Sequence, residues 1–115
     1  MSWHLGRMAP FDLETTGVDP EQARIVEAFA GRVGGALEPL NPDPILVNPG
    51  IEVPEGASKV HGYTTEYLRE HGCPADAGVN IIVSWVADAL QEGVPLVGHN
   101  ISYDLTVLDR ECRRY

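Results

Sequence analysis

Residues 12–17 of the sequence are Asp12-Leu13-Glu14-Thr15-Thr16-Gly17. This stretch overlaps the end of an apolar run at residues 7–13 that is typical of a β-strand. Residues i and i+2 of a strand point to the same side, so the carboxylates of Asp12 and Glu14 face one way at its C-terminal end. Two carboxylates held together repel unless one is protonated or a divalent cation binds them. Oxygen ligands of this kind favour magnesium or manganese over zinc. The alternative is a strand end that bears two solvated acids.

The residues that follow the two acids make the pair more informative. Thr15, Thr16 and Gly17 supply hydroxyl groups and a backbone that a phosphate or ribose can approach closely. The complete string should arise by chance in a chain of this length on the order of once in 10⁴ sequences, which weakens the solvated-acid alternative. It resembles the first exonuclease motif of the DnaQ-like 3′→5′ exonucleases (the DEDDh type), a proofreading family with a ribonuclease H-like fold.

A second informative stretch follows an apolar strand at residues 95–98 and opens a helix at about residues 102–114: His99-Asn100-Ile101-Ser102-Tyr103-Asp104. A purely structural interpretation makes Asn100 or Ser102 the N-cap and Asp104 an acid favoured by the helix dipole. The stretch also resembles the family's second motif. That resemblance implies that Asp104 is the third catalytic acid and that Tyr103 stacks near the terminal base of the substrate.

Between these motifs, residues 51–64 (IEVPEGASKVHGYT) resemble the segment that borders the substrate cleft in many DnaQ-like proteins. The resemblance places His61 at that cleft. The structural alternative puts Val60 and Tyr63 in the core and makes His61-Gly62 a turn. Both interpretations remain open for His61.

The resemblance implies a set of site residues. The catalytic residues, which would also ligate two Mg²⁺ or Mn²⁺ ions, are Asp12, Glu14 and Asp104. The substrate would be bound by Leu13, Thr15, Thr16, His61, His99, Asn100 and Tyr103. The enzyme would be a hydrolase that releases 5′-mononucleotides from single-stranded or frayed 3′ ends of DNA, or of RNA, because the terminal base must leave the stack. A DNA polymerase subunit is the candidate protein partner.

The remaining pattern predicts an α/β fold. Strands are expected at residues 7–13, 24–33, 44–48 and 95–98, with short helical turns near 57–60 and 65–70. A helix at 76–91 should bury Val79, Ile82, Val83, Val86 and Leu90, with Ile81 and Trp85 widening that face, and the last helix should bury Leu105, Leu108 and Cys112. This order predicts a ribonuclease H-like mixed β-sheet, an antiparallel three-strand meander plus a parallel strand, flanked by helices.

Residues 1–115 are expected to form a single exonuclease domain that is incomplete at its C-terminus. The family's third motif, H-x-A-x-x-D, supplies a histidine general base and the last acid, and the resemblance places it beyond Tyr115 with a final strand and helix. His71 and Asp76 have that spacing, but Pro74 between them is incompatible with one continuous helix. Two alternatives to an active exonuclease stay open: an inactive fragment that binds metal or nucleotide weakly, and a non-enzymatic interaction module.

Composition limits the classes of function. The net charge of −9 argues against a protein that wraps nucleic acid with a basic face, but it permits an enzyme that grips phosphates through metal ions. No apolar run approaches the ~20 residues of a membrane span, and residues 1–7 lack the features of a secretory signal. Cys73 and Cys112 are too few for a disulfide framework and fit no zinc site, so the cytoplasm is the expected location. His4 is expected at the surface or at a strand edge.

Overall fold

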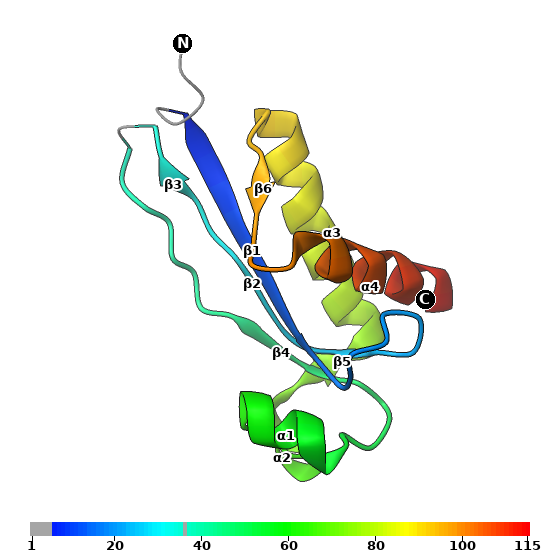
Figure 1. Ribbon diagram of the computed structural model, residues 1–115. Helices are drawn as coiled ribbons and strands as arrows, with labels where there is room; N and C mark the ends of the chain where they lie inside the picture. Colours follow the sequence, from blue (N-terminus) through cyan, green and yellow to red (C-terminus); the bar gives the residue numbers. More distant parts are fainter. Residues whose placement is uncertain (1–5, 36) are drawn as a thin grey trace.

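A computed structural model describes residues 6–35 and 37–115, so His4 lies outside the described residues. The sheet is built on three antiparallel strands, β1 (Arg7–Thr15), β2 (Ile25–Ala30) and β4 (Ile45–Asn48). Shorter strands extend it: β3 (Val33–Gly34) runs antiparallel to β1, β5 (Cys73–Pro74) runs parallel to β4, and β6 (Leu96–Val97) runs parallel to β1. The predicted mixed sheet, an antiparallel meander plus a parallel strand, is confirmed (Figure 1).

Helices flank this sheet on one face and at one end. They are α1 (Glu55–His61), α2 (Thr65–His71), α3 (Ala75–Glu92) and α4 (Ile101–Arg114). Figure 1 shows α3 and α4 on one face of the sheet, while α1 and α2 lie together at the end where β1 finishes. None of the helices in the described residues is long and apolar enough to cross a membrane.

Two strand boundaries differ from the prediction. β1 continues past Leu13, so that Glu14 and Thr15 belong to the strand itself. The single strand predicted at residues 24–33 is divided, because Arg32 leaves the ladder and bridges to Leu40. Pro10 is accommodated inside β1, where its carbonyl oxygen accepts the Gly31 N–H at 2.9 Å.

The strand β1 alternates between two environments. Ala9, Phe11 and Leu13 are buried and face the core, whereas Asp12 and Glu14 point to the other side. The core that forms around Phe11 combines residues of the sheet with residues of α3 and α4: Leu13, Ala23, Ile25, Ala28, Ala30, Val47, Val79, Ile82, Val107 and Leu108. The acids are therefore displayed by a strand whose opposite face is anchored in the core.

The buried face of α3 differs in part from the predicted one. Val79 and Ile82 are buried and Trp85 and Val86 are half-buried, but three predicted core residues are exposed: Ile81, Val83 and Leu90. The helix instead presents the small residues Gly78 and Ala89 to the interior. A Cβ atom on Gly78 would lie 2.9 Å from the Val47 side chain, so the close approach of α3 to β4 depends on this glycine. A hydrophobic pattern does not identify such small residues as the buried contact positions of the helix.

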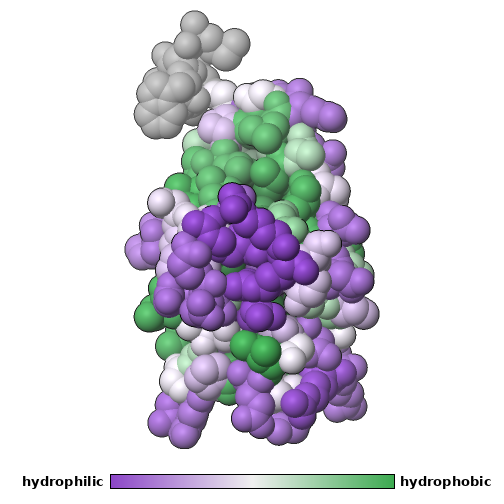
Figure 2. Space-filling model, turned by 90° about the vertical axis from the view of Figure 1, so that its right-hand side faces the viewer, coloured by the Kyte–Doolittle hydropathy of each residue, from purple (hydrophilic) through white to green (hydrophobic). Residues whose placement is uncertain are grey.

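The buried face of α4 is rotated from the predicted one. Leu108 is buried, but Leu105 is 39% exposed and Cys112 is exposed. The face that packs inward contains two acids beside apolar residues: Asp104, Val107, Leu108 and Glu111. Glu111 is compensated by ion pairs with Arg24 and Arg114. A hydrophobic pattern cannot identify an inward face on which two of the four residues are carboxylic acids. Figure 2, which views the molecule from the side where α4 ends, shows a strongly hydrophilic surface there.

Candidate active site

Three carboxylates approach one another where β1 meets α4. Asp12 and Glu14 point away from the core at the C-terminal end of β1, and Asp104 comes from the first turn of α4. The link between them is β6, which pairs in parallel with β1 at Ala9 and Pro10 and leads directly into α4. The fold therefore brings together the acids of two motifs that are about ninety residues apart in the sequence.

Asp104 is the most confined of the three acids. It is only 3% exposed, and its Oδ2 atom is buried without a hydrogen-bond partner among the described residues. Burial first, then the charge of Asp12 and more weakly that of Glu14, raise the pKa of Asp104 to about 6, although a hydrogen bond from the Leu13 backbone opposes them. A buried carboxylate oxygen without a partner is costly unless a proton or a cation neutralises it.

Asp12 and Glu14 experience the same kind of repulsion. Burial raises the pKa of Asp12, and a hydrogen bond from the Leu13 backbone lowers it. The charge of Glu27 raises this pKa further, and His99 lowers it. Burial also raises the pKa of Glu14, and the charges of Asp12 and Glu27 reinforce that effect. The motif acids thus repel one another and a fourth carboxylate.

The fourth carboxylate, Glu27, is a member of the cluster that the sequence analysis missed. It stands directly opposite Glu14 in the ladder between β1 and β2 and therefore shares its side of the sheet. Its Oε2 accepts a hydrogen bond from the Tyr63 hydroxyl, a bond that raises the pKa of Tyr63 to about 12. Glu27 is identified only once the register between β1 and β2 is known, because an antiparallel partner strand places one residue beside each motif acid.

The donor set of this cluster fits divalent cations. It offers carboxylate oxygens, the ligands that magnesium and manganese prefer, and the unpartnered Oδ2 of Asp104 would gain a neutralising partner. Within residues 6–35 and 37–115, no three His, Cys, Asp or Glu side chains are placed so that they could hold one ion together. Carboxylates that repel one another are expected to stay apart until a cation draws them in.

A cleft of about 320 Å³ lies beside the acids and joins distant parts of the sequence. Six predicted site residues line it: Leu13, Glu14, Thr15, His61, Asn100 and Tyr103. The rest of its lining comes from the loop after β1 and from α1: Gly17, Val18, Gly56, Ala57 and Val60. Val60 is 82% exposed, so its alternative placement in the core is wrong.

Hydroxyl groups hold the two sides of this cleft together. Thr15 Oγ1 lies 2.7 Å from the Tyr103 hydroxyl and donates to the Gly17 carbonyl at 2.8 Å. The Tyr103 hydroxyl also donates to the Gly17 carbonyl. The loop after β1 is thereby fixed against the start of α4, which leaves the Tyr103 ring as a wall of the cleft.

His61 is held in one orientation at the cleft. Its Nδ1 accepts the Tyr63 N–H at 3.1 Å, so the neutral ring carries its proton on Nε2. Nε2 is buried and has no partner among the described residues, and burial lowers the pKa of His61, opposed by the Thr15 backbone and Glu27. The ring also stacks on Tyr63, with centroids 5.5 Å apart. His61 therefore offers the cleft a neutral, flat ring.

The other predicted site residues, Thr16, His99 and Asn100, lie in three different environments. Thr16 is 5% exposed and its Oγ1 accepts the Arg24 N–H at 2.9 Å, so it braces the loop instead of lining the cleft. His99 is exposed and close enough to Asp12 to lower its pKa, but it does not line the cleft. Asn100 occupies the N-cap position of α4 without a capping bond from its side chain, and it lines the cleft.

Comparisons with known proteins identify related sequences. The family model for exonucleases matches residues 10–115. DNA polymerase III subunit epsilon of Rickettsia prowazekii is 32% identical over 107 residues, which cover 87% of this chain and 42% of the relative. A DNA polymerase III subunit epsilon-like protein of Rhodobacter capsulatus is 34% identical over 103 residues, covering 88% of this chain and 14% of the relative.

Solved structures show the same fold. Escherichia coli exonuclease I in complex with a dT13 oligonucleotide superimposes with a TM-score of 0.75 at 22% identity, over 95% of this chain and 24% of that one. Exonuclease I of Methylocaldum szegediense gives a TM-score of 0.68 at 23% identity, over 88% of this chain and 22% of that one. The chain spans less than half the length of the Rickettsia relative and about a quarter of these structures. The predicted ribonuclease H-like α/β class is confirmed.

Proposed function

The chain belongs to the exonuclease family, and we propose that it acts as a metal-dependent 3′→5′ exonuclease that hydrolyses nucleic-acid 3′ ends to 5′-mononucleotides. The observation that carries the proposal is the position of Asp104. Its buried, unpartnered oxygen is close enough to Asp12 and Glu14 for their charges to raise its pKa. Each raised pKa means that the ionised carboxylate is unfavourable in the folded protein. Placing these acids close together therefore lowers stability, which is expected at a functional site and not in a purely structural cluster.

Members of this family are generally dependent on divalent metal ions, and the proposed ligands of two Mg²⁺ or Mn²⁺ ions are Asp12, Glu14 and Asp104. When bound, such ions neutralise phosphate charge and generate a nucleophilic water at neutral pH. The residues of the chain set the geometry: β1 fixes the first two carboxylates through its core-facing side, and the start of α4 fixes the third.

The cleft beside the acids is the proposed site for the terminal nucleotide. The rings of His61 and Tyr103 offer flat surfaces for a base, and Thr15 and Asn100 offer polar groups for the sugar and phosphate. Leu13 contributes its backbone beside the acids, His99 stands near Asp12, and Thr16 supports the loop from within. A cleft that takes in one unstacked nucleotide favours single-stranded or frayed ends.

The substrate is proposed to be DNA, with RNA as the alternative, and a DNA polymerase subunit is the proposed partner, because the relatives are DNA polymerase III subunits. The chain would act as one exonuclease domain. The free thiols of Cys73 and Cys112 are compatible with the cytoplasm as its location. An inactive fragment or a non-enzymatic interaction module is not favoured, because the exonuclease family model matches residues 10–115 and the similar sequences are DNA polymerase III epsilon subunits.

The experiment that tests this function measures release of mononucleotides from a 3′-labelled single-stranded oligonucleotide with Mg²⁺ or Mn²⁺. We expect release that EDTA and Asp12→Ala both abolish, whereas Glu52→Ala, which removes an exposed acid outside the cluster, preserves it. A circular single strand should remain intact, since an exonuclease requires an end. Absence of release by the folded protein with either metal, or equal release by Asp12→Ala, would contradict the proposal.

A further inference from the structure

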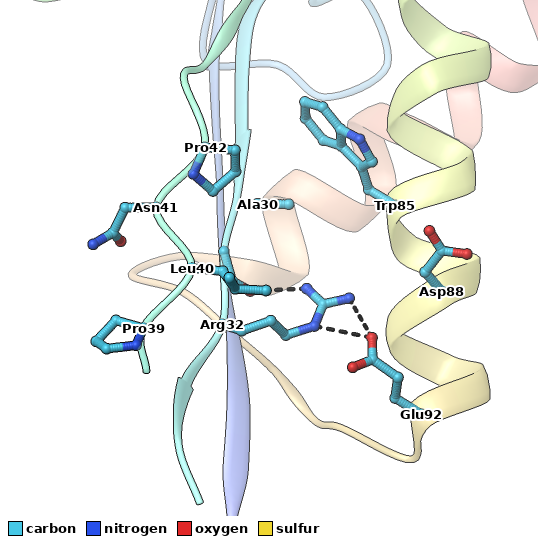
Figure 3. Close-up of a pocket in the computed structure, with 10 residues that line it drawn as sticks. Ala30, Arg32, Pro39, Leu40, Asn41, Pro42, Trp85, Asp88 and Glu92 are labelled. Carbon is cyan, nitrogen blue, oxygen red and sulfur yellow. Dashed lines mark hydrogen bonds and ion pairs between the residues drawn. The ribbon is translucent and has the colours of Figure 1, made fainter. Parts of the chain in front are cut away.

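A second, larger cavity lies away from the carboxylates. It has a volume of about 520 Å³ and is formed between the C-terminal half of α3 and residues 39–42 of the segment that leads to β4 (Figure 3). It includes Ala30 of β2, which shares the core side of the sheet with Phe11, whereas Asp12 and Glu14 point to the other side. None of its lining residues belongs to the catalytic cleft.

The walls of this cavity are largely apolar and include one aromatic ring. Trp85 extends from α3 toward Pro42, and Pro39 and Leu40 continue the opposite wall (Figure 3). The indole is half-buried because it packs against the core, so its orientation is fixed while it still borders the cavity. A fixed indole face is suited to an apolar or cationic planar group.

The basic residue in the lining, Arg32, is already occupied. Its Nε and Nη2 donate to Glu92 Oε2 at 3.0 and 2.7 Å, and its Nη1 donates to the Gly31 carbonyl at 2.8 Å. Its side chain is only 11% exposed. Arg32 therefore closes one end of the cavity and is not available to an anionic ligand.

Asp88 is the charged residue of the lining that is left after Arg32 and Glu92 have paired with each other. It lies on α3 almost one turn after Trp85, it is exposed, and it makes no ion pair or side-chain hydrogen bond with any residue of 6–35 and 37–115. With Arg32 and Glu92 compensating each other, the cavity keeps one negative charge beside its indole. The net charge of the whole chain, −9, adds long-range attraction for a cation and repels phosphates.

A guanidinium group matches these features better than an ammonium ion does. It is planar and weakly hydrated, so it stacks on an indole between apolar walls, and its forked donors fit a carboxylate. We propose that this cavity binds an arginine side chain of a partner protein, stacked on Trp85 and paired with Asp88. The site is separate from the catalytic cleft, and binding there does not depend on nuclease activity.

The test uses the indole N–H signal of Trp85 in NMR spectra of a Trp3→Phe variant, where it is the single tryptophan of the chain. The probe is an acetylated, amidated hexapeptide with one central arginine, and the matched control peptide carries citrulline, which has the shape of arginine without its charge. We expect a saturable shift with the arginine peptide, weakened at least about fivefold by citrulline, by Asp88→Asn and by raised salt. Glu52→Gln, which changes the net charge equally at a distant exposed site, should leave affinity unchanged.

Asp88 is exposed, so Asp88→Asn preserves the fold and the test does not rest on truncating Trp85. The proposal is overturned if the arginine peptide gives no saturable shift, if the citrulline peptide binds equally well, or if Asp88→Asn has no effect. It is also overturned if a single-stranded oligonucleotide shifts the Trp85 signal at lower concentrations than the peptide, since the site would then serve nucleic acid.

Discussion

The hydroxyl of Tyr63 donates a hydrogen bond to Oε2 of Glu27, and Glu27 stands opposite Glu14 across the ladder between β1 and β2. This bond ties the segment after α1 to the carboxylate cluster. The same tyrosine stacks on His61 at 5.5 Å, and its backbone N–H orients the His61 ring. Tyr63 therefore connects a wall of the cleft with the acids beside it.

Tyr63→Phe removes this hydrogen bond and should lower the free energy of unfolding by about 1 kcal/mol at pH 8. The pKa of Tyr63 is raised to about 12 in the folded protein, so the bond stabilises the fold fully below the unfolded pKa of about 10. That contribution is lost as pH rises through about 12. Urea unfolding at pH 8 and at pH 11 should show the difference between wild type and Tyr63→Phe becoming smaller. Tyr67→Phe is the control, since no hydrogen bond of its hydroxyl joins it to the described residues, and an equal loss in both variants would contradict this role.

Asp104→Asn should stabilise the metal-free protein at pH 8 while abolishing nuclease activity. The pKa of Asp104 is raised to about 6, so the folded state holds this proton more tightly than the unfolded state, whose pKa is about 3.9. The associated stability is complete below about pH 4 and is lost as pH rises through about 6. Asparagine keeps the shape without the charge and should recover on the order of 1 kcal/mol at pH 8.

Chemical unfolding in EDTA from pH 4 to pH 8 measures this effect. The curves of wild type and Asp104→Asn should diverge above about pH 5, with the variant more stable. Parallel curves over the whole range would show that the carboxylate of Asp104 is not destabilised by its surroundings.

Divalent metal should raise the thermal stability of the wild type by relieving the same repulsion. At a Mg²⁺ or Mn²⁺ concentration tenfold above its dissociation constant, binding to the folded state adds about 1.4 kcal/mol, a shift of several degrees in Tm. Asp12→Ala should reduce this shift, and Glu52→Ala, at an exposed site outside the cluster, should not. Equal shifts in both variants would place metal binding elsewhere.

The motif strings identified six of the residues that line the cleft, because the chemistry they resemble constrains residue type and spacing there. Asp12, Glu14 and Asp104 come together as their positions on a strand and a helix start require. Thr16 shows the limit of this reasoning, since it lies in the same string but turns inward to the Arg24 backbone. A motif identifies a segment, and only packing decides which of its side chains reach the cleft.

Features that depend on pairing or close packing were harder to predict. Glu27 joins the acids through strand register, which the local sequence does not specify. The close contact of α3 with β4 is made at Gly78, a residue that a hydrophobic pattern does not mark as buried. The same pattern assigned a core position to Leu90, which is exposed. The seven-residue helices α1 and α2 were predicted only as turns, because such short helices show little periodicity and depend on tertiary contacts.

Gly98 allows the chain that enters α4 to pass close to β1. A Cβ atom at this position would lie 2.6 Å from the carbonyl oxygen of Phe11, the residue before Asp12. Gly98→Ala should therefore push the start of α4, and Asp104 with it, away from β1. We expect a loss of about 1–3 kcal/mol in stability. A displacement near 1 Å at a catalytic group lowers activity by up to about 10²-fold.

Thermal unfolding, metal titration and nuclease assays on Gly98→Ala separate these effects. The variant should bind Mn²⁺ more weakly than wild type at a temperature where both are folded, because the spacing between Asp104 and Asp12 has changed. Gly56→Ala is the control for thermal unfolding and metal titration only, because Gly56 also lines the cleft. A Cβ atom there meets nothing within 4 Å, and alanine favours the helical conformation that Gly56 has in α1. If Gly98→Ala folded with wild-type metal affinity, the close approach at Phe11 would not be what positions Asp104.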